Sequence, residues 1–170
     1  MEKTVDPAKE IGENVTITEC SQLSSITPEQ AKKIKSLIIE NQMLDVNFGG
    51  FLLSLNELDS LCFYKCDNLD YALSCVNHSN VLRLLDCDLT SKDVTWCLSS
   101  ILCWGHVEIL DLSYNNIGNY PEHFFHWLKN NLWGGLNIDK IVLTDNKFTE
   151  DDKLKYFSYF ENWGYPEIIL

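Results

Sequence analysis

The sequence predicts an α/β solenoid with a parallel concave sheet and helices on the convex side. Two observations predict this fold. A short hydrophobic pattern recurs six times along the chain, and the stretches between the copies carry apolar residues at helical spacing. Strands that alternate with helices in this way form a parallel sheet with the helices packed against it.

The clearest copy of the pattern begins at Val107. It reads VEILDLSYNNI and fits the spacing LxxLxLxxNxL at every specified position. A second copy follows downstream, at Ile138, Ile141, Leu143, Asn146 and Phe148. A third precedes it, at Ser79, Leu82, Leu84, Cys87 and Leu89, with Cys in place of Asn. Three consecutive copies at one spacing are not a chance match.

Three weaker copies lie further upstream. They are Leu58, Leu61, Phe63 and Cys66, then Ile34, Leu37, Ile39 and Gln42, then Val15, Ile17 and Cys20. The ninth position, which holds Asn, Cys or Gln, falls at residues 20, 42, 66, 87, 115 and 146, giving spacings of 22, 24, 21, 28 and 31. Leucine-rich repeats have a period of about 20 to 29 residues. The sequence therefore predicts a leucine-rich-repeat horseshoe.

The domain boundaries follow from the extent of the repeats. We expect residues 1–11 to be a polar lead-in and residues 12–170 to be one domain of about six repeats. Tyr165, Ile168 and Leu170 match the first, fourth and sixth positions of a seventh copy, so a terminal strand should follow. The chain is either complete at this strand or part of a longer protein.

Each repeat position has a physical role. Positions 1, 4 and 6 of a short strand point into the core, and the chain then turns sharply. At the turn, the ninth side chain can bind backbone groups of neighbouring repeats that would otherwise be buried without a partner. We therefore expect Cys20, Cys66 and Cys87 to be structural members of an Asn/Cys ladder, with Gln42 as a further member.

The return segments have helix start signals. Thr27 is followed by Pro28 and by Gln30 three residues later, which is an N-cap, a first-turn proline and a capping box. Thr149 and Asp152 repeat the arrangement. Apolar residues at helical spacing predict two further helices, over residues 90–102 and 121–132.

Composition narrows the classes of partner. The formal net charge of −12 disfavours nucleic acid and anionic membranes, because both carry negative charge. No apolar stretch is long enough to cross a bilayer, and the start MEKTVDPAKE lacks the apolar run of a secretion signal. Seven cysteines, an odd number, favour free thiols in a reducing compartment. We expect a cytoplasmic protein whose partner is a protein, with a basic partner complementing its charge.

The repeats resemble the ribonuclease-inhibitor-like class of leucine-rich repeats, from residue 12 to the end. The segments VLRLLDCDLTSKDV and VEILDLSYNNIG are similar to the carboxy-terminal repeats of NOD-like receptors, which are intracellular innate immune sensors. Two departures stand against the likeness. Ribonuclease inhibitors alternate repeats of fixed length, whereas these spacings are irregular. The phosphate-binding loop GxxxxGK[ST] of a nucleotide switch does not occur in this sequence.

Strand alternation predicts which side chains face the concave side. Side chains at the fifth, seventh and eighth positions of the third to fifth repeats form a central patch. Its members are Tyr64, Lys65, Arg83, Leu85, Asp86, Asp111 and Tyr114. Aromatic and Arg side chains are enriched in protein-binding hot spots. Two alternatives remain open: Arg83 and Asp111 form only a surface ion pair, or the partner binds the helical flank.

The sequence gives little support for catalysis, a cofactor or a metal. Cys62 is the cysteine expected to be open on the concave face, but no histidine is expected there to activate it. His123 and His126 share a helical face without a carboxylate or cysteine in a recognisable ligand pattern. We therefore expect no catalytic, cofactor or metal residues.

These observations lead to two functional expectations. The first is a protein-binding module that serves as the recognition or autoregulatory region of an intracellular innate immune receptor, with other domains of a longer parent chain as further partners. The second is a stand-alone regulator or inhibitor of an enzyme, such as a nuclease or a small GTPase, held in the concave face. Catalysis by an exposed cysteine is a weaker third possibility.

Overall fold

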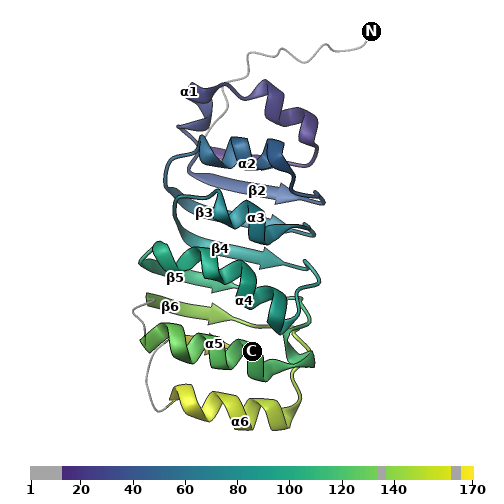
Figure 1. Ribbon diagram of the computed structural model, residues 1–170, viewed down its shortest axis with the longest axis vertical. Coiled ribbons are helices and arrows are strands. Elements are labelled where there is room, and N and C mark those ends of the chain that lie inside the picture. The colour runs from purple at the N-terminus through teal and green to yellow at the C-terminus, as the bar shows by residue number, and fades with distance from the viewer. Residues whose placement is uncertain (1–12, 134–136, 162–165) are drawn as a thin grey trace.

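The computed structural model describes residues 13–133, 137–161 and 166–170 (Figure 1). The lead-in expected over residues 1–11 and the expected strand residue Tyr165 lie outside these ranges. The described elements stack along the long axis of the molecule in chain order (Figure 1). Each strand and the return segment that follows it are called a coil below.

The strands form one parallel sheet in the order of the sequence, β1-β2-β3-β4-β5-β6-β7. Their bounds are β1 (Asn14–Ile17), β2 (Ser36–Glu40), β3 (Leu58–Tyr64), β4 (Ser79–Leu85), β5 (His106–Asp111), β6 (Asn137–Val142) and β7 (Glu167–Ile169). The α/β class, the parallel sheet and the strand in each copy of the pattern, including the terminal one, are thereby confirmed.

The return segments are mostly helical. Their elements are η1 (Cys20–Ser25), α1 (Pro28–Ala31), α2 (Val46–Leu53), α3 (Leu69–Ser74), α4 (Ser91–Ser99), η2 (Ser100–Cys103), η3 (Ile117–Asn119), α5 (Pro121–Trp133) and α6 (Glu150–Glu161). Figure 1 shows α2 to α6 on the same side of the sheet. The other side is called the open face. Among the described residues, none of the helices could span a membrane.

The core lies between the sheet and the helices. Positions 1, 4 and 6 of the pattern are fully buried in the central coils, as Leu58, Leu61 and Phe63 of the third coil illustrate. Helices contribute large apolar side chains from their inner faces, including Phe48 of α2 and Phe124 of α5. Because the second to sixth coils bury the same positions, one continuous core runs along the described part of the chain.

The expected side-chain ladder joins consecutive coils from Gln42 to Asn146. Asn115 shows its geometry best: its Nδ2 donates to the carbonyl of Leu84 in the preceding coil at 2.7 Å. Its Oδ1 accepts from the backbone N–H groups of Cys87 and Leu89, both at 3.1 Å. Asn146 binds the coil before it in the same way, donating to the Leu112 carbonyl at 2.8 Å. Each side chain therefore satisfies backbone groups of the preceding coil.

Cysteines take the ladder position in two coils. The Cys66 thiol donates to the Ile39 carbonyl at 3.3 Å, and the Cys87 thiol donates to the Phe63 carbonyl at 3.6 Å. Gln42 continues the series with its Nε2, 2.6 Å from the Thr18 carbonyl. The expectation for Cys20 is wrong, because this residue is exposed at the start of η1. The chain enters a 3-10 helix at Cys20, and its side chain is left outside the core.

The helix start signals at Thr27 and Thr149 are confirmed, and Thr90 has the same geometry. Each of these threonines accepts a hydrogen bond from the backbone N–H three residues later. In each case, the side chain at that third position binds back to the threonine N–H. Such reciprocal capping satisfies donors that the first helical turn leaves unpaired. The caps thus fix where the chain turns from the sheet into its return segment.

A left-handed residue follows the strand in five consecutive coils. These residues are Asn41, Lys65, Asp86, Tyr114 and Asp145, with φ between 52° and 62°. Left-handed backbone is unfavourable for residues other than glycine. These five residues lie one to three positions beyond the strand end, where the chain turns away from the sheet. This places the side chains of the turn along one edge of the sheet, beside the open face.

Candidate functional site

Three strands at the middle of the open face carry most of the predicted patch. The register pairs Cys62 of β3 with Arg83 of β4, and Arg83 with Asp111 of β5. Tyr64 and Leu85 are register partners two residues further along the same strands. Seen from the open face, the side chains form rows that cross the strands. Arg83 lies at the centre of these rows.

Half-buried apolar side chains surround Arg83. Val81 and Leu85 lie two residues before and after it on β4, and Ile109 of β5 is paired with Val81. Ile38 and Val142 extend the apolar character toward the neighbouring strands. We call these five residues the apolar belt. Of them, only Leu85 belongs to the patch predicted from the sequence. That patch was limited to the fifth, seventh and eighth positions of the third to fifth repeats, whereas Val81 and Ile109 hold the third position, which shares the open face because strand side chains alternate.

Arg83 and Asp111 do not form the ion pair that was one reading of the sequence. Nη1 of Arg83 donates instead to Oγ of Ser60 on β3, at 2.9 Å. The Asp111 carboxylate accepts from the backbone N–H of Ser113 at 3.0 Å and from its hydroxyl at 2.6 Å. Ser60 lies toward the start of the strands and Ser113 beyond their ends. The two charged groups are therefore drawn apart, although their Cα atoms are register partners.

Lys65 and Asp86 form a pair beside the open face. Nζ of Lys65 is 3.3 Å from the Asp86 carboxylate and 5.2 Å from the centre of the Tyr64 ring. The Tyr64 hydroxyl and then the Asp86 carboxylate raise the pKa of Lys65. Both side chains are about half exposed, at 47% and 45%. A surface pair of this kind contributes little to stability.

Tyr114 completes the patch at the turn after β5. Its side chain is 56% exposed and its backbone is left-handed. The backbone N–H of Asp86 donates to the Ser113 carbonyl, so the turns after β4 and β5 are adjacent. The structure therefore brings Tyr64, Lys65, Leu85, Asp86 and Tyr114 to one edge of the open face, with Arg83 and Asp111 on the strands.

The expectation that Cys62 is open on this face is wrong. Only 8% of the residue is exposed, because it lies between Ile38 and Arg83 on the adjacent strands. Burial raises the pKa of the Cys62 thiol to about 11. A nucleophilic cysteine reacts as the thiolate. At neutral pH this thiol is protonated and covered, which removes it as a candidate for covalent chemistry.

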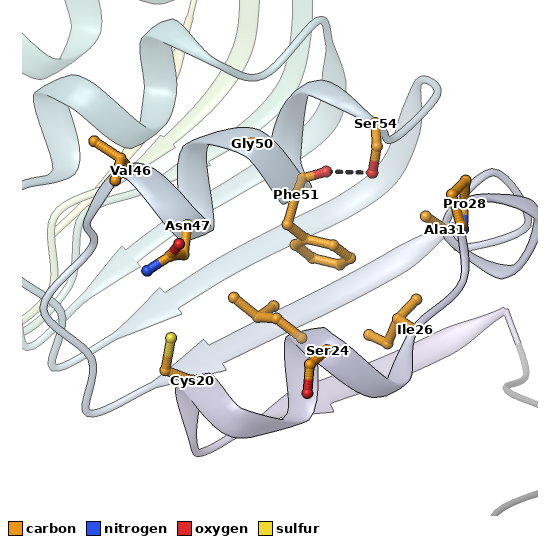
Figure 2. Close-up of a pocket in the computed structure, with 11 residues that line it drawn as sticks. Cys20, Ser24, Ile26, Pro28, Ala31, Val46, Asn47, Gly50, Phe51 and Ser54 are labelled. Atoms are coloured by element: carbon orange, nitrogen blue, oxygen red, sulfur yellow. Dashed lines mark hydrogen bonds between the residues drawn. The ribbon is translucent and has the colours of Figure 1, made fainter.

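A hollow lies away from the open face, between η1 and α2 (Figure 2). It has a volume of about 490 Å³ and is lined mainly by small and apolar residues, among them Leu23, Ile26 and Phe51. Figure 2 shows the Cys20 thiol directed toward α2 and the Phe51 ring directed toward η1. The hollow exists because η1 buries none of its residues. Sequence reasoning did not predict it.

A second hollow of about 390 Å³ opens where β3 and β4 lead into their helices. Its lining includes the carboxylates of Asp67, Asp70, Asp88 and Asp93 and the indole of Trp96, which is 66% exposed. Asp93 is engaged in capping Thr90, and Asp88 accepts from Asn116. No group of three or more His, Cys, Asp or Glu in the described ranges is arranged to hold a metal ion.

Comparisons of the chain with family models, with curated proteins and with solved structures each return no match. The likeness of the repeats to leucine-rich repeats and to NOD-like receptors therefore stays a prediction. What the structure shows is an α/β fold with a single parallel sheet of seven strands and helices between the strands. This arrangement is compatible with a solenoid.

Proposed function

We propose that this chain is a protein-binding leucine-rich-repeat module and that its partner binds the centre of the open face. One observation carries the proposal: Tyr64 and Arg83 lie on adjacent strands among half-buried apolar side chains. Hot spots in protein interfaces combine aromatic and Arg anchors with surrounding contacts that exclude water. The apolar belt provides such surroundings on β2 to β6.

The shape of the open face and the net charge of the chain support a protein partner. Small molecules bind in concave, mostly apolar pockets. The hollows described above lie elsewhere, and the centre of the open face is a row of strand side chains. The formal charge of −12 opposes binding of a nucleic acid backbone. A folded protein or a peptide segment meets both conditions.

The repeat class is supported by two features that recur together. From the second coil to the sixth, the first, fourth and sixth positions are buried, and an Asn, Cys or Gln side chain binds the backbone of the coil before it. We further propose, on the sequence resemblance alone, that the module is the recognition or autoregulatory part of an intracellular innate immune receptor.

Site-directed photo-crosslinking tests the location of the site. A benzophenone side chain at position 85 of the open face should yield partner adducts. The same group at position 154, an exposed leucine of α6 on the helical side, should not. Combining Tyr64→Ala with Arg83→Glu should lower the yield at position 85 by about 1000-fold, because two hot-spot residues each contribute about 2 kcal/mol or more.

The control is the matched double variant Tyr120→Ala with Lys33→Glu. Both of its sites are exposed and belong to return segments. It repeats the loss of one aromatic ring and the reversal of one charge. All variants should keep the circular-dichroism melting curve of the parent chain. Adducts that form at position 154 but not at position 85 would move the site to the helical flank.

A further inference from the structure

Arg83 is the single arginine of the chain, whereas the other basic residues are lysines. It occupies the central position of the open face, half-buried on the middle strand of the sheet. Arginine differs from lysine in presenting a planar fork of donors that matches a carboxylate. The chain therefore places its only such fork at the centre of the proposed binding site.

Most of that fork is unused. A guanidinium carries five N–H donors, and in the described part of the chain only Nη1 of Arg83 donates, to Ser60. Ser60 Oγ holds the side chain toward the start of the strands. The nearest carboxylate by register, Asp111, is held by Ser113 toward the other end. Arg83 is thus oriented but has no anionic partner within the described part of the molecule.

Apolar neighbours make a guanidinium without an anionic partner unfavourable in the free protein. The same neighbours strengthen its pairing with a carboxylate in a complex. Val81 and Leu85 lie two residues away on either side, which is about 6 to 7 Å along a strand. A partner that covers these side chains also removes water from Arg83. A desolvated cation without an anion is strongly unfavourable, whereas a bidentate pair with a carboxylate restores the lost interactions.

We propose that Arg83 binds an Asp or Glu side chain of the partner protein, flanked in that partner by apolar residues that contact Val81 and Leu85. The proposal rests on the proposed function and names the chemistry of the partner at the same site. A helix meets this requirement with an acidic residue at one position and apolar residues three or four positions away, because these lie about 5 to 6 Å apart. The long-range attraction of a basic partner to the acidic chain is a separate effect.

A displayed peptide library tests this chemistry without a known partner. Each 12-residue peptide carries two apolar residues, each three positions from a central residue that is Asp, Glu, Asn, Gln or Lys. Selection on the intact chain should enrich Asp and Glu at the centre by about tenfold or more over Asn and Gln. Selection on Arg83→Glu should instead enrich Lys. Enrichment of Lys on the parent chain would overturn the proposal in favour of a basic partner.

Charge exchange on a selected peptide gives a sharper readout. Arg83→Glu should weaken the acidic peptide at least about tenfold, and changing its central acid to Lys should restore affinity for that variant. Arg83→Lys should also weaken binding, because an ammonium lacks the planar fork. Asp111→Asn should strengthen binding by about twofold to threefold, since it removes a neighbouring negative charge. Lys33→Glu, on a return segment, is the matched control and should leave affinity unchanged.

The outcomes separate this inference from the proposed function. If peptides bind and Tyr64→Ala weakens them, but Arg83→Gln and the central acid do not matter, the open face is the site and the role of Arg83 is refuted. If neither Tyr64→Ala nor Arg83→Gln changes binding, the open-face site itself is refuted. Parallel melting curves for Arg83→Gln and Arg83→Lys establish that any loss is not a loss of folding.

Discussion

The first coil and the central coils follow the same hydrophobic pattern but differ after the strand. In the central coils, the ninth side chain is buried and binds the preceding coil, as Asn115 does. In the first coil, Cys20 is exposed, η1 buries no residue, and α1 has four residues. The hollow of about 490 Å³ lies beside that coil. A buried strand therefore does not suffice to close a coil.

This difference teaches which contacts complete a coil. The sixth position of the pattern is fully buried in both regions, as Ile17 of the first coil and Leu112 of the fifth coil show. What the first coil lacks is a ladder side chain and a return helix with an apolar inner face. Mutations that remove ladder contacts should therefore matter in the centre of the array and not at its first coil.

The largest effect is expected for Asn115→Ala. This change removes the acceptor of the Cys87 and Leu89 N–H groups and the donor to the Leu84 carbonyl, all in the buried interior. Each buried group left without a partner costs about 1 to 3 kcal/mol, so we expect the free energy of unfolding to fall by about 3 kcal/mol or more. Urea denaturation followed by circular dichroism measures it.

The matched change in the first coil is Cys20→Ala. An exposed side chain without a buried contact should contribute less than about 0.5 kcal/mol. Equal losses for the two variants would contradict the distinction between the regions. In that case the ladder would not be what completes the central coils.

A loss of folding stability of intermediate size is expected when the pH rises. Burial raises the pKa of the Cys87 and Cys97 thiols from 9.0 to about 12. Between these values the unfolded chain loses the thiol protons and the folded chain keeps them, so unfolding releases protons. Stability is full below pH 9 and should fall as the pH rises toward 12, by up to about 1.4 kcal/mol per thiol and pH unit.

Thermal melts at pH 8 and pH 10 measure this loss. The variant Cys97→Ala should show a smaller decrease between the two pH values, because it has one buried thiol fewer. Cys20→Ala, which removes an exposed thiol, should keep the decrease of the parent chain. A decrease that is unchanged in Cys97→Ala would exclude the buried thiols as its source.

The smallest effect concerns the helix caps. Thr90→Ala removes the cap of α4, which buries Val94 and Leu98, and should lower the free energy of unfolding by about 1 kcal/mol. Thr27→Ala removes an equivalent cap from the four-residue α1 and should have a smaller effect. Differential scanning calorimetry of both variants compares the two regions. A larger effect for Thr27→Ala would reverse their order.

Most of the fold could be predicted because its information is local and repeated. The positions that point into the core recur at one spacing, so Leu61, Leu82 and Leu110 could each be assigned from the pattern. The ladder from Gln42 to Asn146 was predictable for the same reason, since Asn, Cys or Gln follows the sixth position by three residues. The caps at Thr27, Thr90 and Thr149 depend on residues within four positions of each other.

The features that sequence reasoning missed depend on neighbours in space. Cys62 has an outward position in the pattern, yet Ile38 and Arg83 on the adjacent strands cover it. Arg83 and Asp111 were expected side by side, but Ser60 and Ser113 draw their charged groups apart. Whether a side chain is covered depends on the sizes and rotamers of residues about 20 to 30 positions away in the sequence. The spacing of the repeat pattern alone does not predict which side chains are covered.

Each ladder side chain binds the coil that precedes it in the sequence, and this has a consequence for folding. Asn115 completes the hydrogen bonds of the coil before it, and Asn146 does the same for the coil of Asn115. A single coil in isolation would lack the side chain that pairs its buried N–H groups, so a coil needs its neighbour to be complete. Once one pair exists, each added coil pairs groups that are already ordered. Folding should therefore nucleate among β3 to β6 and spread from neighbour to neighbour, and amide hydrogen exchange should be slowest there.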